Sequence, residues 1–145
     1  MALNLVKLCV GCDSIEDLAA WIGFRLAEQR GAGLVPEQTH TTRMVPKRVD
    51  ELLDGGSLYW VIKGNVQCRQ RLLDIRPFTD AAGINRCHFV LEPKIVPTHW
   101  QPRRAFQGWR YLGDNEVPQD EAAGKSGRAA LPAALRQELA ALGLL

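Results

Sequence analysis

The residues best suited to binding a ligand are lysines and arginines in the middle of the chain, where aromatic residues are interleaved with them. Residues 39–111 hold 12 Lys and Arg against 6 Asp and Glu, whereas residues 1–38 and 112–145 each hold 3 basic and 5 acidic residues. The middle segment also contains three of the four tryptophans, both tyrosines and all three histidines. Because cations pair with phosphates and flat rings stack on bases, this pattern predicts a site for RNA or another phosphate-bearing ligand.

Two arginines in the strand predicted from Val66 are the first candidates for phosphate contacts. Arg69 and Arg71 alternate with apolar residues, so they share one face of the strand about 7 Å apart, close to the spacing of neighbouring phosphates. Lys63 lies across a predicted Gly64-Asn65 hairpin turn and adds a third cation. The alternative is a solvated face whose arginines pair with acidic neighbours on other strands.

The second candidate element covers residues 100–112. Arg103 and Arg104 lie in a proline-rich loop, and Trp109 and Tyr111 occupy one face of a predicted last strand. These two rings, together with Trp60, are the predicted stacking residues, since a base stacked on an aromatic side chain contributes about 1–3 kcal/mol. The alternative is that alternating bulky rings simply form the core.

An enzyme is the main alternative function, with a small-molecule pocket between residues 46–54 and the hairpin 57–76. His40, Arg43, Asp54 and Lys63 would supply its polar groups. The chain lacks the glycines of a phosphate-binding loop and the serine elbow of a hydrolase, so no residue is assigned a catalytic role.

The four cysteines give no evidence for a metal site. Cys9 and Cys12 are closely spaced, but Cys68 and Cys87 lie singly in strand-like runs, unlike the two close pairs of a zinc module. No export signal or membrane span is evident, so the thiols are expected to be free and buried in a cytoplasmic protein. No cofactor is predicted.

The apolar patterns predict an α+β fold: a small, strongly bent antiparallel sheet or PUA-like pseudo-barrel with two to three helices packed on it. Ser14 and Asp17 form a capping-box pattern before a long helix, and Pro46 opens a short helix ended by Gly55-Gly56. The predicted strands are residues 3–10, 40–44, 58–63, 66–76, 86–91 and 106–112, with residues 93–105 kept irregular by prolines. The three consecutive strands 58–63, 66–76 and 86–91 are expected to pair antiparallel. The apolar side of the second of them shifts at Leu72-Leu73, which predicts a bulge or a strand crossing a barrel corner.

The predicted organisation is a single domain over residues 1–115, a polar linker over 116–130 and a C-terminal helix over 131–145. The apolar pattern of this helix centres on residues 131–142. A protein-interaction adaptor that uses this helix is therefore a third functional class.

Three segments carry a resemblance to a known family: Thr42–Arg48, Asp54–Gly64 and Pro102–Leu112. Over residues 3–112 the chain resembles small alphaproteobacterial proteins of about 145 residues, catalogued as a domain of unknown function. That resemblance implies no activity and no site residue.

A looser similarity is to PUA-like and ASCH-type barrels, in which a short helix ending in Gly precedes a strand and hairpin. Those folds bind RNA or modified bases in a cleft beside that helix. The chain departs from the ASCH pattern, because Gly56-Ser-Leu-Tyr stands where Gly-x-Lys is expected.

Overall fold

The computed structural model describes residues 3–104 and 106–121. These residues form seven strands and two helices, in the order β1 (Leu3–Leu8), α1 (Ile15–Gly31), β2 (Gln38–Thr42), α2 (Val49–Leu53), β3 (Ser57–Ile62), β4 (Asn65–Thr79), β5 (Asn85–Leu91), β6 (Val96–Pro102) and β7 (Trp109–Gly113). Within the described ranges, no helix is long and apolar enough to cross a membrane.

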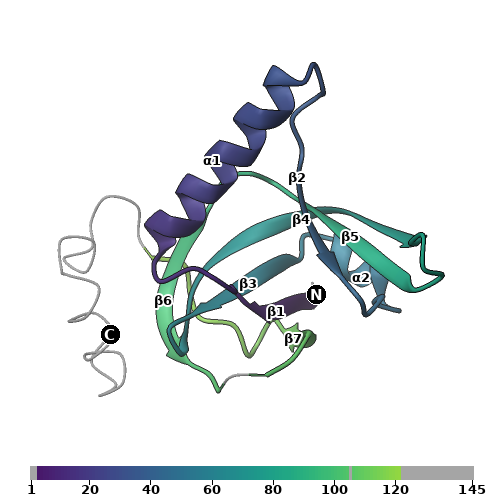
Figure 1. The fold of residues 1–145 in the computed structure, drawn as a ribbon. Helices are drawn as coiled ribbons and strands as arrows, with labels where there is room; N and C mark the ends of the chain where they lie inside the picture. Colours follow the sequence, from purple (N-terminus) through teal and green to yellow (C-terminus); the bar gives the residue numbers. More distant parts are fainter. Residues whose placement is uncertain (1–2, 105, 122–145) are drawn as a thin grey trace.

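The strands form one mixed sheet in the order β2-β5-β4-β3-β1-β7, with β6 added on β4 (Figure 1). The three consecutive strands β3, β4 and β5 pair antiparallel, as predicted, whereas β1 pairs parallel with β3 and antiparallel with β7. The sheet is not closed along the described strand order, so the α+β class is supported and a relation to PUA-like barrels stays a prediction.

Strand β4 joins the two parts of this sheet because its 15 residues pair with β3 and β6 at one end and with β5 at the other. The register with β5 shifts between Leu72 and Asp74, which confirms the irregularity expected from the sequence at Leu72-Leu73. Such a bulge bends the strand. The bend turns β5 and β2 away from β3, β1 and β7 (Figure 1).

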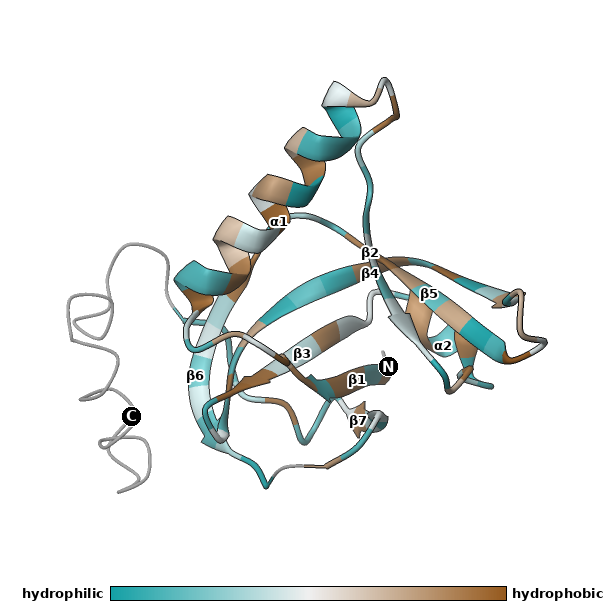
Figure 2. Cartoon of the chain, viewed as in Figure 1, coloured by the Kyte–Doolittle hydropathy of each residue, from teal (hydrophilic) through white to brown (hydrophobic). Residues whose placement is uncertain are grey.

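Helix α1 begins where the sequence predicts. The Ser14 side chain accepts a hydrogen bond from the Asp17 backbone N–H at 3.1 Å, as an N-cap should. Leu18 and Ile22 are buried, and Ile15 and Leu26 pack beside them, but hydrophobic and hydrophilic residues alternate around the rest of the helix (Figure 2). The C-terminal end of α1 projects beyond the sheet before the chain returns as β2 (Figure 1).

Apolar side chains are buried on both faces of the central strands. One cluster includes Leu5, Trp60 and Phe89, and side chains of α1 and α2 pack against it. The other cluster includes Val6, Tyr59 and Val66. Gly56 lets β1 approach the end of α2 closely, since a Cβ atom there would lie 2.1 Å from the Leu3 carbonyl oxygen. The fold therefore needs glycine at this position.

Two local predictions are wrong. The hairpin turn is Lys63-Gly64, one residue earlier than predicted, because both residues take positive φ angles of 50° and 79° and Asn65 already belongs to β4. Prolines do not keep residues 96–102 irregular, since they form β6. Strand β6 pairs with β4 on one side and, on the other, is bridged only by residues 119–121, and such an outer strand tolerates proline because few ladder bonds need its N–H.

The predicted linker over 116–130 falls only partly within the described residues. There, the Gln119 carbonyl accepts a hydrogen bond from the His99 N–H, and the Glu121 N–H donates one to the Pro97 carbonyl. Thr98 and Asp120 form the bridge between them, so residues 119–121 lie along β6. The rest of that segment and the predicted helix over 131–145 lie outside the described residues.

Candidate functional site

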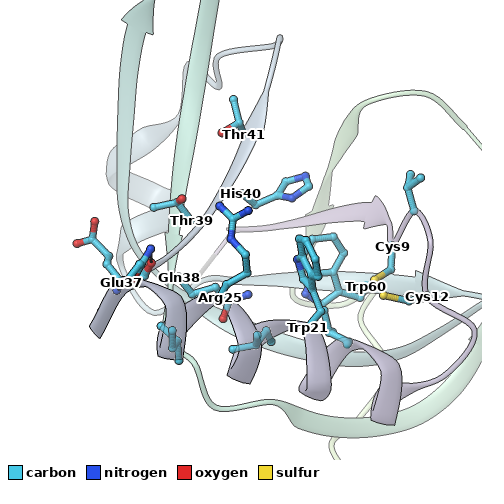
Figure 3. A pocket seen from close by; sticks show the side chains of 15 residues that line it. Cys9, Cys12, Trp21, Arg25, Glu37, Gln38, Thr39, His40, Thr41 and Trp60 are labelled. Carbon is cyan, nitrogen blue, oxygen red and sulfur yellow. Dashed lines mark hydrogen bonds between the residues drawn. The ribbon is translucent and has the colours of Figure 1, made fainter. Parts of the chain in front are cut away.

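A cavity of about 380 Å³ lies between α1, β2, β3 and the turn that follows β1 (Figure 3). Its volume is within the range of small-molecule pockets, roughly 300–1,000 Å³. Its lining combines apolar, aromatic, polar and sulfur-bearing side chains from these four elements: Cys9, Val10, Cys12, Leu18, Trp21, Ile22, Arg25, Leu26, Gln29, Glu37, Gln38, Thr39, His40, Thr41 and Trp60.

His40 is the polar residue of this cavity that lacks a partner. Its ring meets the edge of Trp60 in a T-shaped contact with 5.1 Å between centroids, and its Nε2 is buried without a hydrogen-bond partner among residues 3–104 and 106–121. Burial lowers the pKa of His40 to about 4, and the charge of Lys7 adds to this effect. The imidazole is therefore neutral at pH 7, and its buried Nε2 is left without a hydrogen-bond partner among the described residues.

The opposite ring, Trp60, is fixed by a buried amide network. Its indole N–H donates to Gln70 Oε1 at 2.9 Å. The Gln70 amide also exchanges hydrogen bonds with Gln38 at 2.6 and 3.1 Å and donates to the Glu92 carbonyl at 3.0 Å. Because every polar atom of Gln70 is engaged, Trp60 presents a rigid surface to the cavity.

The charges around the cavity favour an anion. Glu37 lines it, but its carboxylate is bound by the Arg76 guanidinium at 2.7 and 3.1 Å. Arg25 reaches over the Trp21 ring, 5.4 Å from its centroid, and has no carboxylate within ion-pair distance in the described part of the chain. Lys7 on β1 lies opposite Trp60 on β3 and opposite Trp109 on β7. It is half-buried, and this burial lowers its pKa.

The predicted phosphate-binding residues lie in two separate places. Arg69 is bound by Asp120 at 2.6 and 2.8 Å and by the Ser57 hydroxyl, while Arg71 is exposed beside Lys94. Lys63 lies in the turn before β4, paired with Asp13 at 3.1 Å, and the Arg103 N–H donates to the Gly64 carbonyl. Arg104 follows and is exposed. Arg69 and Lys63 thus already have acidic partners, as in the alternative interpretation.

The predicted stacking residues are largely internal. Trp60 and Trp109 are only 3% and 7% exposed. The Trp109 indole N–H donates to the Met44 carbonyl at 2.8 Å, and the Tyr111 hydroxyl accepts from the backbone N–H groups of Lys47 and Arg48 at 2.9 and 3.3 Å. Trp109 and Tyr111 therefore hold the segment before α2 against β7.

Of the residues predicted for an enzyme pocket, the structure places His40 alone in the cavity. Asp54 is exposed at the end of α2, near Asp50 and Glu51, and Arg43 is exposed after β2. The pocket therefore lies against α1 rather than between α2 and the hairpin, because β2 aims His40 towards α1 and β3 (Figure 3). No group of three or more His, Cys, Asp or Glu suited to a metal occurs in the described ranges.

Sequence reasoning missed the contribution of α1 to this site. Trp21 and Arg25 lie four residues apart and hence on one side of the helix, next to the buried Leu18 and Ile22. The one available signal in the sequence was the pair itself, an aromatic residue and a cation beside the apolar residues of the helix. In the structure Trp21 is 56% exposed, and both residues line the cavity.

The comparison with protein families decides where the chain belongs. Residues 5–145 match the family described as "Protein of unknown function (DUF1489)". The chain belongs to this family. No curated protein and no solved structure matches it. The family description names no ligand or reaction, so the function has to be argued from the cavity itself.

Proposed function

We propose that this protein binds a small organic anion with a planar ring in the cavity between α1, β2 and β3. The observation that carries the proposal is the buried Nε2 of His40, a residue that lines the cavity and contacts Trp60 with its ring, because this nitrogen has no hydrogen-bond partner in the described part of the protein. A buried polar atom is nearly always hydrogen-bonded in a folded protein. A ligand that enters the cavity supplies the missing partner.

The ring of the ligand is the part that the cavity walls favour. Trp60 offers an immobile indole, and Leu18 and Ile22 add apolar surface from α1. Trp21 stands at the rim, where its exposed ring covers a bound molecule. Aromatic and apolar walls with few polar groups are typical of pockets for small organic ligands.

The negative charge of the ligand follows from the cations around the cavity. Arg25 is unpaired among the described residues, Lys7 lies behind His40, and the one lining carboxylate, Glu37, is already neutralised by Arg76. The positive potential of these cations strengthens the binding of a phosphate or a carboxylate and weakens the binding of a cationic ligand. Because His40 is neutral, it selects among ligands through a hydrogen bond and not through its charge.

This proposal keeps the phosphate-bearing ligand expected from the sequence but moves it from a basic surface into a pocket. A nucleotide, free or at the end of an RNA, is one source of such a ligand, and an aromatic carboxylate is another. Conversion of such a ligand into a product would support the enzyme alternative, in which His40 would act by hydrogen bonding, because a pKa of about 4 makes it a weak proton acceptor.

The test is calorimetric titration of the full chain with AMP, adenosine, ribose 5-phosphate and anthranilate. We expect the two planar anions to bind, and adenosine and ribose 5-phosphate to bind at least about tenfold more weakly, which corresponds to about 1.4 kcal/mol. Equal affinity for all four probes, or binding of none, would contradict the proposal.

Two substitutions of His40 sharpen this test. The amide of His40→Gln falls near the position of Nε2, whereas the amide of His40→Asn falls near Nδ1. We therefore expect His40→Gln to retain most of the affinity for the planar anion and His40→Asn to lose about tenfold. Arg71→Gln, which removes an exposed arginine outside the cavity, is the matched control and should bind like the parent.

A further inference from the structure

Cys9 and Cys12 lie on a tight turn between β1 and α1. The Cys12 N–H donates to the Cys9 carbonyl at 3.4 Å, and Gly11 has a φ of 84° at the third position, as a type II turn requires. Such a turn places its first and last Cα atoms within about 7 Å. A disulfide needs Cα atoms about 4.4–6.8 Å apart. The backbone is therefore already near the geometry of a bridge.

The two thiols are also in contact with each other. Figure 3 shows both sulfur atoms side by side at the cavity, and the proximity of Cys12 contributes to the raised pKa of Cys9. Both residues are partly exposed and line the cavity, whereas Cys68 and Cys87 are fully buried. A small molecule that enters the cavity thus reaches Cys9 and Cys12, and not the other two cysteines.

We propose that Cys9 and Cys12 form a reversible dithiol–disulfide site that is oxidised by a small hydroperoxide entering through the cavity. This inference does not depend on the proposed ligand, because it rests on the turn, the sulfur contact and the access to the pair. The site goes beyond what the sequence predicts, which is four free thiols buried in the core.

The order of the two steps follows from the burial of the Cys9 thiol. Burial raises the pKa of Cys9, and the neighbouring Cys12 raises it further, so Cys9 keeps its proton while the more accessible sulfur reacts first. The Cys12 thiolate attacks the distal peroxide oxygen and the O–O bond breaks. The products are a Cys12 sulfenic acid and, with one proton, an alcohol, or water when the oxidant is hydrogen peroxide.

The second step closes the bridge. The Cys9 sulfur attacks the Cys12 sulfur, and the displaced hydroxide leaves as water with the Cys9 proton. Two thiols have then lost two electrons and two protons, and the hydroperoxide has been reduced by two electrons. A small dithiol reverses the change by exchange through a mixed disulfide.

The test treats the folded full chain with hydrogen peroxide, alkylates the remaining thiols and maps the peptides by mass spectrometry. We expect a Cys9–Cys12 cross-link, complete reversal by dithiothreitol, and Cys68 and Cys87 alkylated only after denaturation. Absence of this cross-link in the folded chain, or a Cys12–Cys68 bridge in its place, would overturn the proposal.

Single serine substitutions then test the order of attack. In Cys9→Ser the reaction should stop at a Cys12 sulfenic acid that a 1,3-diketone captures, whereas Cys12→Ser should leave Cys9 mostly reduced under the same conditions. Cys87→Ser is the matched control and should form the bridge like the parent. Capture of a Cys9 sulfenic acid in Cys12→Ser as fast as the parent protein forms its bridge would contradict the assigned order. Circular dichroism checks that each variant is folded.

Discussion

Two aromatic clusters flank Lys7 on the same face of the sheet, and they differ in whether their polar atoms have partners. Around Trp109 and Tyr111, the indole N–H donates to Met44 and the phenol oxygen accepts two backbone N–H groups. Around Trp60 and His40, the indole is bound by Gln70, but Nε2 of His40 has no partner in the described ranges. We call the Trp109–Tyr111 cluster complete, because these polar atoms all have partners, and the Trp60–His40 cluster incomplete, because Nε2 has none among the described residues.

This difference separates a structural role from a binding role better than residue type does. The sequence offers tryptophan, tyrosine and basic residues in both places. Only the accounting of hydrogen bonds shows that Trp109 and Tyr111 fix a loop, whereas His40 faces a cavity with an unused nitrogen. The predictions that follow test the two clusters against each other.

The largest loss of stability is expected from a substitution in the complete cluster of Trp109 and Tyr111. Trp109→Ala removes a buried ring that contacts Phe89 and Tyr111 and also frees the Met44 carbonyl, so the free energy of unfolding should fall by about 3–5 kcal/mol. Urea denaturation followed by circular dichroism measures this. Trp21→Ala, at the exposed rim of the cavity, is the contrast and should lower stability by no more than about 1 kcal/mol.

The next largest effect is a pH dependence of the unfolding free energy, caused by His40 in the incomplete cluster. The pKa of His40 is about 4 in the folded chain and 6.5 in an unperturbed histidine, so the unfolded chain binds the extra proton first as the pH falls. His40 therefore lowers stability progressively from pH 6.5 to pH 4, by up to about 3 kcal/mol. Above pH 6.5 this contribution is constant.

The matched measurement is urea denaturation of the parent and of His40→Gln at a series of pH values. The difference between the two proteins isolates His40 from the carboxylates that titrate in the same range. We expect the difference in unfolding free energy to change between pH 6.5 and pH 4 and to be flat above. A difference that is flat throughout would show that His40 is solvated and titrates normally.

A smaller loss is expected when the acceptor in the complete cluster is removed. Tyr111→Phe keeps the ring but leaves the backbone N–H groups of Lys47 and Arg48 without their acceptor, and the site is 36% exposed. Because water replaces part of this interaction, stability should fall by about 1 kcal/mol. Hydrogen exchange should accelerate at Lys47 and Arg48 while the amides of β3 and β4 keep their protection.

The smallest change in stability is expected for Arg25→Gln at the rim of the cavity. The arginine is exposed, so the free energy of unfolding should stay within about 0.5 kcal/mol of the parent. Its affinity for AMP should nevertheless fall roughly two- to fivefold, as for a partly exposed ion pair of about 0.5–1 kcal/mol. Calorimetry with Arg71→Gln in parallel distinguishes a contact in the cavity from a general loss of charge.

Local signals in the sequence predicted the elements well. The Ser14 cap, the three consecutive strands and the bulge near Leu72 depend on neighbouring residues, and each is found close to its predicted place. Strand β6 was missed because proline disfavours only central strands, and the sequence does not say which strand lies at an edge.

The site was harder to predict because its chemistry depends on distant partners. Arg69 is neutralised by Asp120, 51 residues away, and Glu37 by Arg76, 39 residues away. No pattern in the neighbourhood of these residues contains that information. His40 was named from the sequence for a pocket beside residues 46–54, but it lines a cavity against α1, because its environment depends on where α1 crosses the sheet.

The position of β1 has a consequence for how the chain folds during synthesis. This strand is flanked by β3 on one side and by β7 on the other, and Asn4 bonds Asp114, 110 residues further along. At about 5–20 residues per second, a ribosome needs roughly 5–20 s to make the chain between them. Until then β1 exposes one unpaired edge, so this protein completes its sheet late and depends on slow, long-range pairing.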